Sequence, residues 1–192
     1  MIDLEPATRV LTAVVEGVGD EQLTAPTPCA GMSVGDLLDH IDGLALAFTA
    51  AATKELIDAG DQGPSPDGSR LGTDWRPRIA QRLAALTDAW RAAAAWTGMT
   101  RVGGVDLPGD VAGLVALDEV IVHGWDLATA TGQRFRCDPD LAAAAIQFVE
   151  PTAMQNPEGT PGLFGPPLPV SADAPALRRL LGLTGRDVTW TA

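Results

Sequence analysis

The sequence contains no tyrosine, a single lysine, two cysteines and two histidines. Cys29 and Cys137 lie far apart and form no CxxC pair, so we expect neither a disulfide framework nor a cysteine-based zinc motif. Acidic residues outnumber basic ones by 25 to 13, which gives a formal net charge of −12. Because such a surface repels phosphate backbones, we expect no nucleic-acid partner.

The chain also lacks long apolar runs and basic amphipathic faces. Its most apolar stretch, residues 44–52, is too short to cross a bilayer, and Lys54 follows closely. Residues 1–6 contain no basic segment that leads into an apolar one, so we expect no secretory signal. Together with the sparse cysteines, these absences predict a cytoplasmic protein with no membrane partner.

What the chain does contain favours helix. The 192 residues suit one domain, and the 46% of hydrophobic residues suffice for a sizeable core. Alanine is abundant while isoleucine is scarce, so helix is favoured over strand. Apolar periodicity, caps and Gly or Pro breakers predict an all-α fold. The expected helices cover about residues 6–16, 33–59, 75–97, 111–131, 138–149 and 175–183.

The intervening segments have their own character. Residues 61–74 predict an exposed loop, and residues 102–107 a short extended segment. Seven of the 15 prolines fall within 150–175, which predicts ordered coil, and residues 188–190 resemble a strand. We therefore expect a helical bundle over 1–150 and a Pro-rich extension with a short terminal helix, 151–192, packed on it.

The two histidines lie on the most core-like helices. His40 belongs to an apolar stripe with Leu37 and Ile41, and His123 lies in the fourth predicted helix. Glu119 precedes His123 by four positions, so both side chains project from one helix face. His40 from a facing helix would complete a two-histidine, one-carboxylate metal site. Three protein ligands leave a coordination position open for water or substrate.

Each of these residues also has a more ordinary interpretation. Glu and His four residues apart are often a surface pair, and a histidine on an apolar stripe is usually a satisfied core residue. Glu119, however, lies within the apolar run 117–122, where an unpaired carboxylate would cost several kcal/mol. Asp126 follows His123 by three positions and is a candidate acceptor for its second ring hydrogen; a solvent-facing acid is the alternative.

Two further residues near these helices are weaker candidates. Cys29 is a candidate ligand or nucleophile, although a small buried thiol is the favoured interpretation. Trp125 is a candidate pocket wall, but core packing is favoured there too. The sequence provides no obvious general acid or base beyond the predicted ligands and Asp126.

Two stretches resemble a known family. Residues 27–40, TPCAGMSVGDLLDH, and residues 119–128, EVIVHGWDLA, are similar to the second-helix and fourth-helix motifs of the mycothiol-dependent maleylpyruvate isomerase N-terminal domain family. This family belongs to the wider group of DinB-like metalloenzymes. Residues 164–167, FGPP, and 180–187, LLGLTGRD, resemble a short-chain subgroup described only as metal-binding. The similarity extends over nearly the whole chain.

The resemblance implies a DinB-like four-helix bundle with a divalent ion, zinc or nickel, bound by His40, Glu119 and His123. It also implies mycothiol or a similar low-molecular-weight thiol as cosubstrate, acting on an electrophilic substrate. The family commonly has tryptophan where this chain has Met32, so the pocket wall differs. The isomerase proper has a larger C-terminal domain than residues 151–192 provide, so we do not expect maleylpyruvate isomerisation itself.

The sequence leaves three functions open. The first is a metal-dependent thiol transferase or isomerase, in which the metal lowers the pKa of the thiol. The second is a non-catalytic, stress-associated metal-binding protein, a homodimer through an apolar helix face. The third is a hydrolase that uses metal-activated water. Because the surface is acidic, an anionic substrate would require an arginine in the pocket, such as Arg76, Arg78 or Arg186.

Overall fold

The computed structural model describes residues 1–55, 65–160 and 162–191. Helix makes up 58% of the structure, and the all-α prediction is confirmed. The main elements are α1 (Glu5–Glu16), α2 (Val34–Thr53), α3 (Trp75–Trp90), β1 (Met99–Val102), β2 (Val105–Pro108), α4 (Gly109–Ala130), α5 (Pro139–Gln155) and α6 (Ala176–Leu183). Three short 3₁₀ turns accompany them: η1 (Asp20–Gln22), η2 (Gly68–Arg70) and η3 (Ala93–Trp96).

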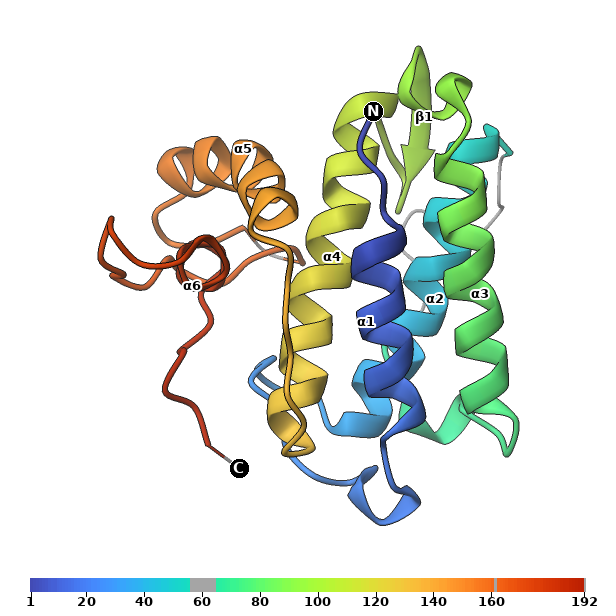
Figure 1. The fold of residues 1–192 in the computed structure, drawn as a ribbon, viewed down its shortest axis with the longest axis vertical. Coiled ribbons are helices and arrows are strands. Elements are labelled where there is room, and N and C mark those ends of the chain that lie inside the picture. The colour runs from blue at the N-terminus through green and yellow to red at the C-terminus, as the bar shows by residue number, and fades with distance from the viewer. Residues whose placement is uncertain (56–64, 161, 192) are drawn as a thin grey trace.

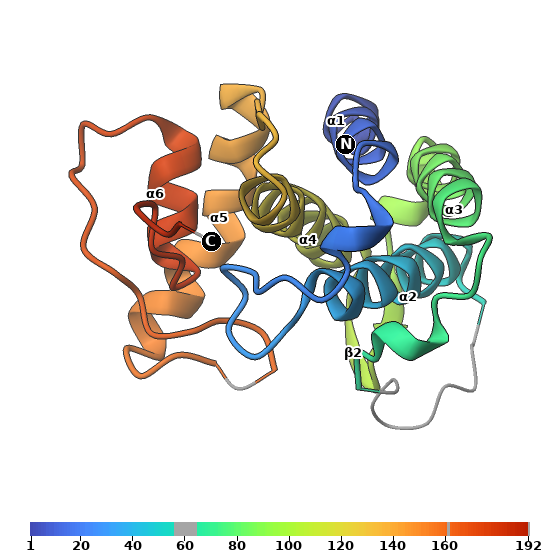
Figure 2. The ribbon, with the colours of Figure 1, turned by 90° about the horizontal axis from the view of Figure 1, so that it is seen from below.

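Helices α1 to α4 form a four-helix bundle (Figure 1). Both α1 and α2 pack against α3 and α4, so α1 and α2 occupy diagonal corners, as Figure 2 shows from below. Helices α1 and α4 run in one direction, and α2 and α3 in the other (Figure 1). As a result, α2 and α4, which carry the two histidines, are antiparallel neighbours.

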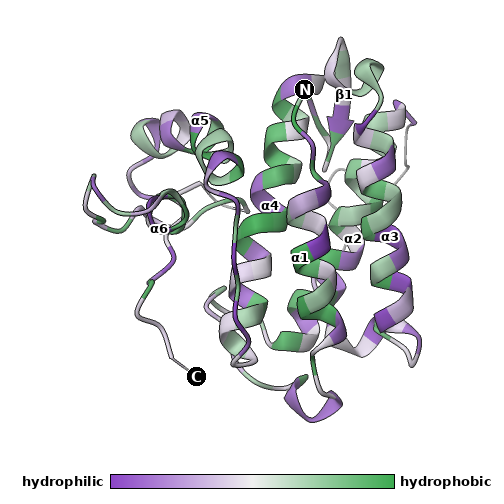
Figure 3. Ribbon diagram, in the orientation of Figure 1, coloured by the Kyte–Doolittle hydropathy of each residue, from purple (hydrophilic) through white to green (hydrophobic). Residues whose placement is uncertain are grey.

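Helix α4 is the central element. It is hydrophobic along much of its length (Figure 3), and the consecutive residues Val120, Ile121 and Val122, which project to different sides of it, are all buried. Helix α5 packs on α4 outside the bundle, and α6 packs on α5. Among the described helices, even the most apolar falls short of the length and hydropathy that a bilayer crossing requires. The division into 1–150 and 151–192 stays a prediction; residue 150 lies within α5.

The start of α2 is fixed by a reciprocal cap. The Ser33 hydroxyl accepts a hydrogen bond from the Asp36 amide at 3.2 Å, and the Asp36 carboxylate accepts one from the Ser33 amide at 3.0 Å. The other Asp36 oxygen accepts the Gly68 amide at 2.8 Å, which ties η2 to α2. The predicted N-cap is confirmed, and it sets the register that places His40 two turns further along the helix.

Helix α3 is shorter than predicted, because it ends at Trp90 and not at residue 97. The chain turns after Trp90, so that the Trp96 indole donates to the Trp90 carbonyl at 2.8 Å. The two rings pack edge to face with centroids 5.0 Å apart. A continuous helix would have carried Trp96 away from this contact. The extended segment expected at 102–107 is part of the hairpin β1–β2, in which Met99 pairs with Pro108.

Predictions for the C-terminal segments were partly wrong. Helix α5 continues through Pro151 to Gln155, because its buried face continues with Val149 and Ala153. Residues 188–190 form a turn and not a strand, since the Thr189 amide and hydroxyl both donate to the Asp187 carboxylate. Residues 61–64 of the predicted loop 61–74 lie outside the described residues. The described part of this loop contains η2.

Gly113 lies where α4 packs closely against the tryptophan pair. A Cβ at this position would lie 2.5 Å from a Trp96 ring carbon and 2.9 Å from a Trp90 ring carbon. We expect Gly113→Ala to lower the free energy of unfolding by about 1–3 kcal/mol, because the rings or the helix must shift. Urea denaturation measures the change.

Gly43 provides the matched control. It lies on the exposed side of α2, and a Cβ there would meet no atom within 4 Å. Gly43→Ala should therefore raise the free energy of unfolding by about 0.5–1 kcal/mol, through helix propensity alone. Equal changes in the free energy of unfolding of the two variants would show that packing at Gly113 does not limit stability.

Candidate metal site

The three predicted ligands converge between α2 and α4. The His123 Nε2 lies 3.0 Å from a Glu119 carboxylate oxygen, and the His40 Nε2 lies 3.9 Å from the same oxygen. All three ligand atoms lie within 4.8 Å of one another. The imidazole rings meet edge to face, with centroids 4.9 Å apart and planes at 85°. The structure therefore brings these side chains together, while their role as ligands stays a prediction.

The spacing suits a divalent ion. Two atoms bound to one tetrahedral zinc at about 2.0–2.1 Å lie about 3.3 Å apart. The observed separations of 3.0 and 3.9 Å bracket that value, so an ion fits with small side-chain shifts. The His40 side chain is 27% exposed, whereas that of His123 is 7% exposed. An ion here would be reachable from solvent on the His40 side.

A buried ion pair supports His123 from behind. Asp126 is fully buried, and its Oδ2 lies 3.0 Å from the His123 Nδ1. The Arg186 guanidinium donates to both Asp126 oxygens, at 3.1 and 3.4 Å, and to the Thr184 carbonyl at 3.0 Å. Asp126 therefore holds a proton on Nδ1 and directs Nε2 towards Glu119.

Cys29 lies on the same side of α4. Its thiol accepts a hydrogen bond from Arg186 at 3.6 Å, and it forms a second close group with His123 and Asp126. Burial raises the pKa of Cys29, and the positive charge of Arg186 only partly opposes this shift. At neutral pH the side chain is thus a half-buried thiol. It stays a candidate ligand, because its sulfur lies within 4.8 Å of ligand atoms of His123 and Asp126.

The two imidazoles have opposite protonation states in the metal-free site. Burial and the neighbouring His123 lower the pKa of His40 to about 4. Burial also acts to lower the pKa of His123, but hydrogen bonds to Asp126 and Glu119 outweigh it and raise the value to about 9. Burial acts to raise the pKa of Glu119, and contact with His123 lowers it on balance. At pH 7, His40 is neutral, His123 is a cation and Glu119 is an anion.

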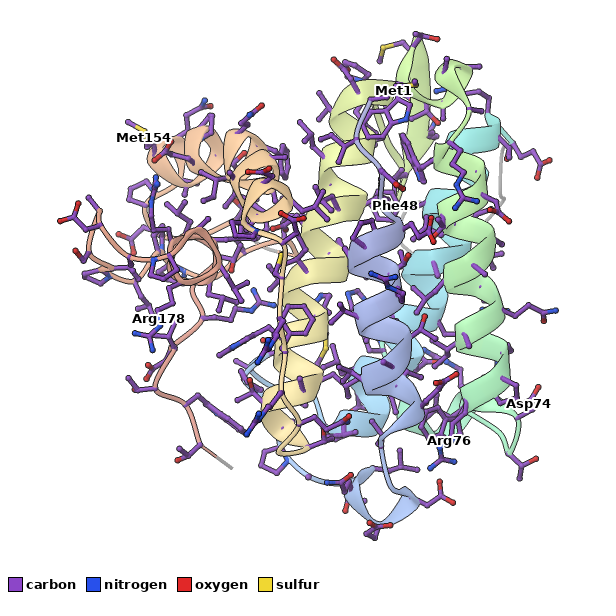
Figure 4. The ribbon with its side chains drawn as sticks, viewed as in Figure 1. Met1, Phe48, Asp74, Arg76, Met154 and Arg178 are labelled. Atoms are coloured by element: carbon purple, nitrogen blue, oxygen red, sulfur yellow. The ribbon has the colours of Figure 1, made fainter. Side chains whose placement is uncertain are left out.

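Of the three arginines considered from the sequence, only Arg186 reaches this site. Arg76 pairs with Asp20, and Arg78 pairs with Asp42 and Asp74. Figure 4 shows Arg76 and Asp74 near the first turn of α3. The only sequence signal for Arg186 was its place in the resemblance at 180–187.

Two neighbouring residues have less direct places. Trp125, next to the predicted ligands in sequence, is partly buried against the core. Its role as a pocket wall stays a prediction. Met32, which stands where the family commonly has tryptophan, also packs partly buried against the core.

The fold and the converging side chains define a helical bundle with a two-histidine, one-carboxylate cluster between antiparallel helices. The chain belongs to the mycothiol maleylpyruvate isomerase N-terminal domain family, whose model matches residues 4–128. The predicted family is thereby confirmed. The match includes His40, Glu119, His123 and Asp126, whereas Arg186 lies beyond it.

Solved and sequenced relatives agree with this assignment. The crystal structure of the mycothiol-dependent maleylpyruvate isomerase matches with a TM-score of 0.58 at 19% identity, over 82% of this chain and 68% of that chain. This likeness confirms the DinB-like fold. Uncharacterized proteins from Mycobacterium tuberculosis strains CDC 1551 and H37Rv are each 28% identical over 186 residues, which is 95% of this chain and 94% of theirs.

The opposite protonation states are directly measurable, because His40 and His123 are the only histidines. In the metal-free protein, the ring-proton signals of His123 should titrate near pH 9 and those of His40 near pH 4. Two-dimensional NMR across this pH range gives both values. Asp126→Asn removes the negative charge of the carboxylate that contacts His123, so it should lower the pKa of His123. Two titrations near the unperturbed value of about 6.5 would contradict the described site.

Proposed function

We propose that the protein is a metal-dependent enzyme in which a low-molecular-weight thiol of the mycothiol type reacts with an electrophilic small molecule, as a transferase or isomerase. The observation that best supports this proposal is the convergence of His40, Glu119 and His123 within 4.8 Å, with the His40 side chain partly exposed. Membership of the isomerase-domain family and the solved mycothiol-dependent relative add support for the thiol.

His40, Glu119 and His123 would hold the divalent ion, zinc or nickel. A bound divalent ion would lower the pKa of a thiol within its reach, so that a thiolate is present at neutral pH. His40 is already neutral at pH 7 and has a lone pair ready. The His123 Nε2 faces Glu119, so it is the nitrogen that would bind the ion. It must first release its proton, because only the deprotonated nitrogen has a free lone pair.

Asp126 and Arg186 act as positioning residues in this scheme. Asp126 keeps the Nδ1 hydrogen of His123 when the Nε2 proton leaves, so the ring holds its orientation. Arg186 neutralises Asp126, which would otherwise be a buried carboxylate without a cationic partner once His123 is neutral. The pair therefore allows an imidazole inside the bundle to change protonation state without moving.

We expect one zinc or nickel ion to bind per chain. His123→Ala should abolish binding, since it removes a ligand and leaves Glu119 and Asp126 without their partner. His40→Ala should weaken binding at least tenfold, about 1.4 kcal/mol. Isothermal titration calorimetry measures both. Cys137→Ser, away from the site, is the matched control, and Cys29→Ser tests the second close group.

The same titration has a second readout. Between pH values of about 4 and 9, His123 is protonated and His40 is neutral, so binding should release about one proton per ion. Affinity should fall about tenfold for each unit of pH lost within this window. Titrations in buffers of different ionisation enthalpy count the proton. Stoichiometric binding by the His40→Ala, His123→Ala double variant would place the metal elsewhere.

The thiol step has its own test. Metal-loaded protein should consume mycothiol in the presence of a model electrophile, and the rate should persist below the ordinary thiol pKa of about 8.5. Glu119→Gln at saturating metal removes one negative charge from the ion. Bound thiol should then ionise more readily but attack more slowly. The metal-free protein and His123→Ala should be inactive.

Other results from this assay would select the remaining functions. Substrate consumption without any thiol would identify a hydrolase. Tight metal binding with no turnover of mycothiol or other cellular thiols would identify a non-catalytic metal-binding protein.

A further inference from the structure

Arginines in this protein are mostly paired with acids. Among the described residues, eight of the twelve arginines form a salt bridge with an aspartate or glutamate: Arg70, Arg76, Arg78, Arg82, Arg91, Arg101, Arg179 and Arg186. Within the described ranges, Arg9, Arg134, Arg136 and Arg178 have no acidic partner. Since acids outnumber bases by 25 to 13, unpaired arginines are the exception here.

Three of these four arginines line one surface pocket of about 380 Å³. Arg9 comes from α1, whereas Arg134 and Arg136 come from the connector between α4 and α5, 125 and more positions later. The remaining lining residues are uncharged: Val10, Ala13, Val14 and Gln133. The pocket therefore combines three positive charges with a partly apolar wall, and none of the described residues that line it is acidic. It shares no residue with the candidate metal site.

The connector is fixed against the bundle by uncharged contacts. Gln133 donates its side-chain amide to the Val14 carbonyl at 2.9 Å and its backbone amide to the Ala128 carbonyl at 2.8 Å. Phe135 packs closely on Gly124, where an added Cβ would lie 2.6 Å from the ring. Figure 1 shows this connector running alongside α4. Because Phe135 is directed inward, Arg134 and Arg136 on either side of it are exposed.

Three like charges held together repel one another unless an anion joins them. The net charge of −12 opposes anion binding at long range, but this effect is screened beyond about 8 Å at physiological salt, so the local charge dominates. Guanidinium groups match phosphate and carboxylate geometry with two parallel hydrogen bonds. The aliphatic side chains of Val10 and Ala13, which are not buried in the core, suit the carbon part of an organic anion.

We propose that this pocket binds a small organic molecule that carries two or more oxyanion groups, either phosphates or carboxylates. The volume of about 380 Å³ lies within the usual range for small-molecule sites. The inference is independent of the proposed metal and thiol chemistry, because it rests on other residues. It adds a second ligand site, on the side of α4 that faces α1.

Calorimetric titration of the full-length protein tests the proposal, with fructose 1,6-bisphosphate as the phosphate probe and tricarballylate as the carboxylate probe. We expect at least one of them to bind, with an affinity that weakens as sodium chloride is added. The Arg134→Gln, Arg136→Gln double variant should raise the Kd at least tenfold, and Arg9→Gln should raise it severalfold. The probe that binds more tightly identifies the class of oxyanion.

Arg178→Gln is the matched control. Arg178 is also exposed and unpaired among the described residues, but it lies on α6, outside the pocket (Figure 4). The Kd of the Arg178→Gln variant for either probe should remain within twofold of the wild-type value. Circular dichroism and thermal denaturation of each variant verify that the bundle is intact. Three results would overturn the proposal: no binding of either probe at millimolar concentration, unchanged affinity in the double variant, or an equal loss in Arg178→Gln.

Discussion

A line of alternating charges through the bundle organises the rest of the structure. Arg186 pairs with Asp126, Asp126 with His123, and His123 with Glu119. Each buried charge is flanked by an opposite one, so the desolvation cost of each is offset by its neighbours. Removal of any member leaves an uncompensated charge in the core, which costs several kcal/mol. The positions of α2, α4 and the C-terminal segment must all satisfy this constraint.

The C-terminal segment is therefore part of the site. The match to the family model ends at residue 128, but the arginine that neutralises Asp126 is Arg186. The turn after α6 positions Arg186, because the Arg186 guanidinium also donates to the Thr184 carbonyl. The Mycobacterium tuberculosis relatives match over 95% of the chain, so their similarity extends into this region as well. The bundle supplies the predicted ligands, and the extension supplies the balancing charge.

Features that depend on neighbours in sequence were predictable. The Ser33–Asp36 cap, the apolar stripes and the i,i+4 pair of Glu119 and His123 follow from helix geometry. The convergence of His40 on that pair was also predictable, because both histidines lie on the most core-like helices. The family resemblance strengthened it.

Features that depend on contacts distant in sequence were not predictable in the same way. Nothing local shows that Arg186 rather than Arg76 or Arg78 meets Asp126, because 60 residues separate the partners. The end of α3 depends on how Trp96 packs on Trp90, and the length of α5 on the burial of Ala153 beyond a proline. In each case tertiary packing overrides a local signal.

The antiparallel placement of α2 beside α4 has a consequence for folding. Glu119 and His123 approach each other as soon as one helix forms, but His40 is 79 positions before Glu119 and reaches them only when the two helices dock. Closing such a long loop costs entropy before any contact repays it. During synthesis, a chain that has emerged only to the end of α4 contains every predicted ligand but lacks Arg186. The interior acquires its full electrostatic balance only when residue 186 has been synthesised, so folding of the bundle is coupled to synthesis of the segment after α6 through one guanidinium.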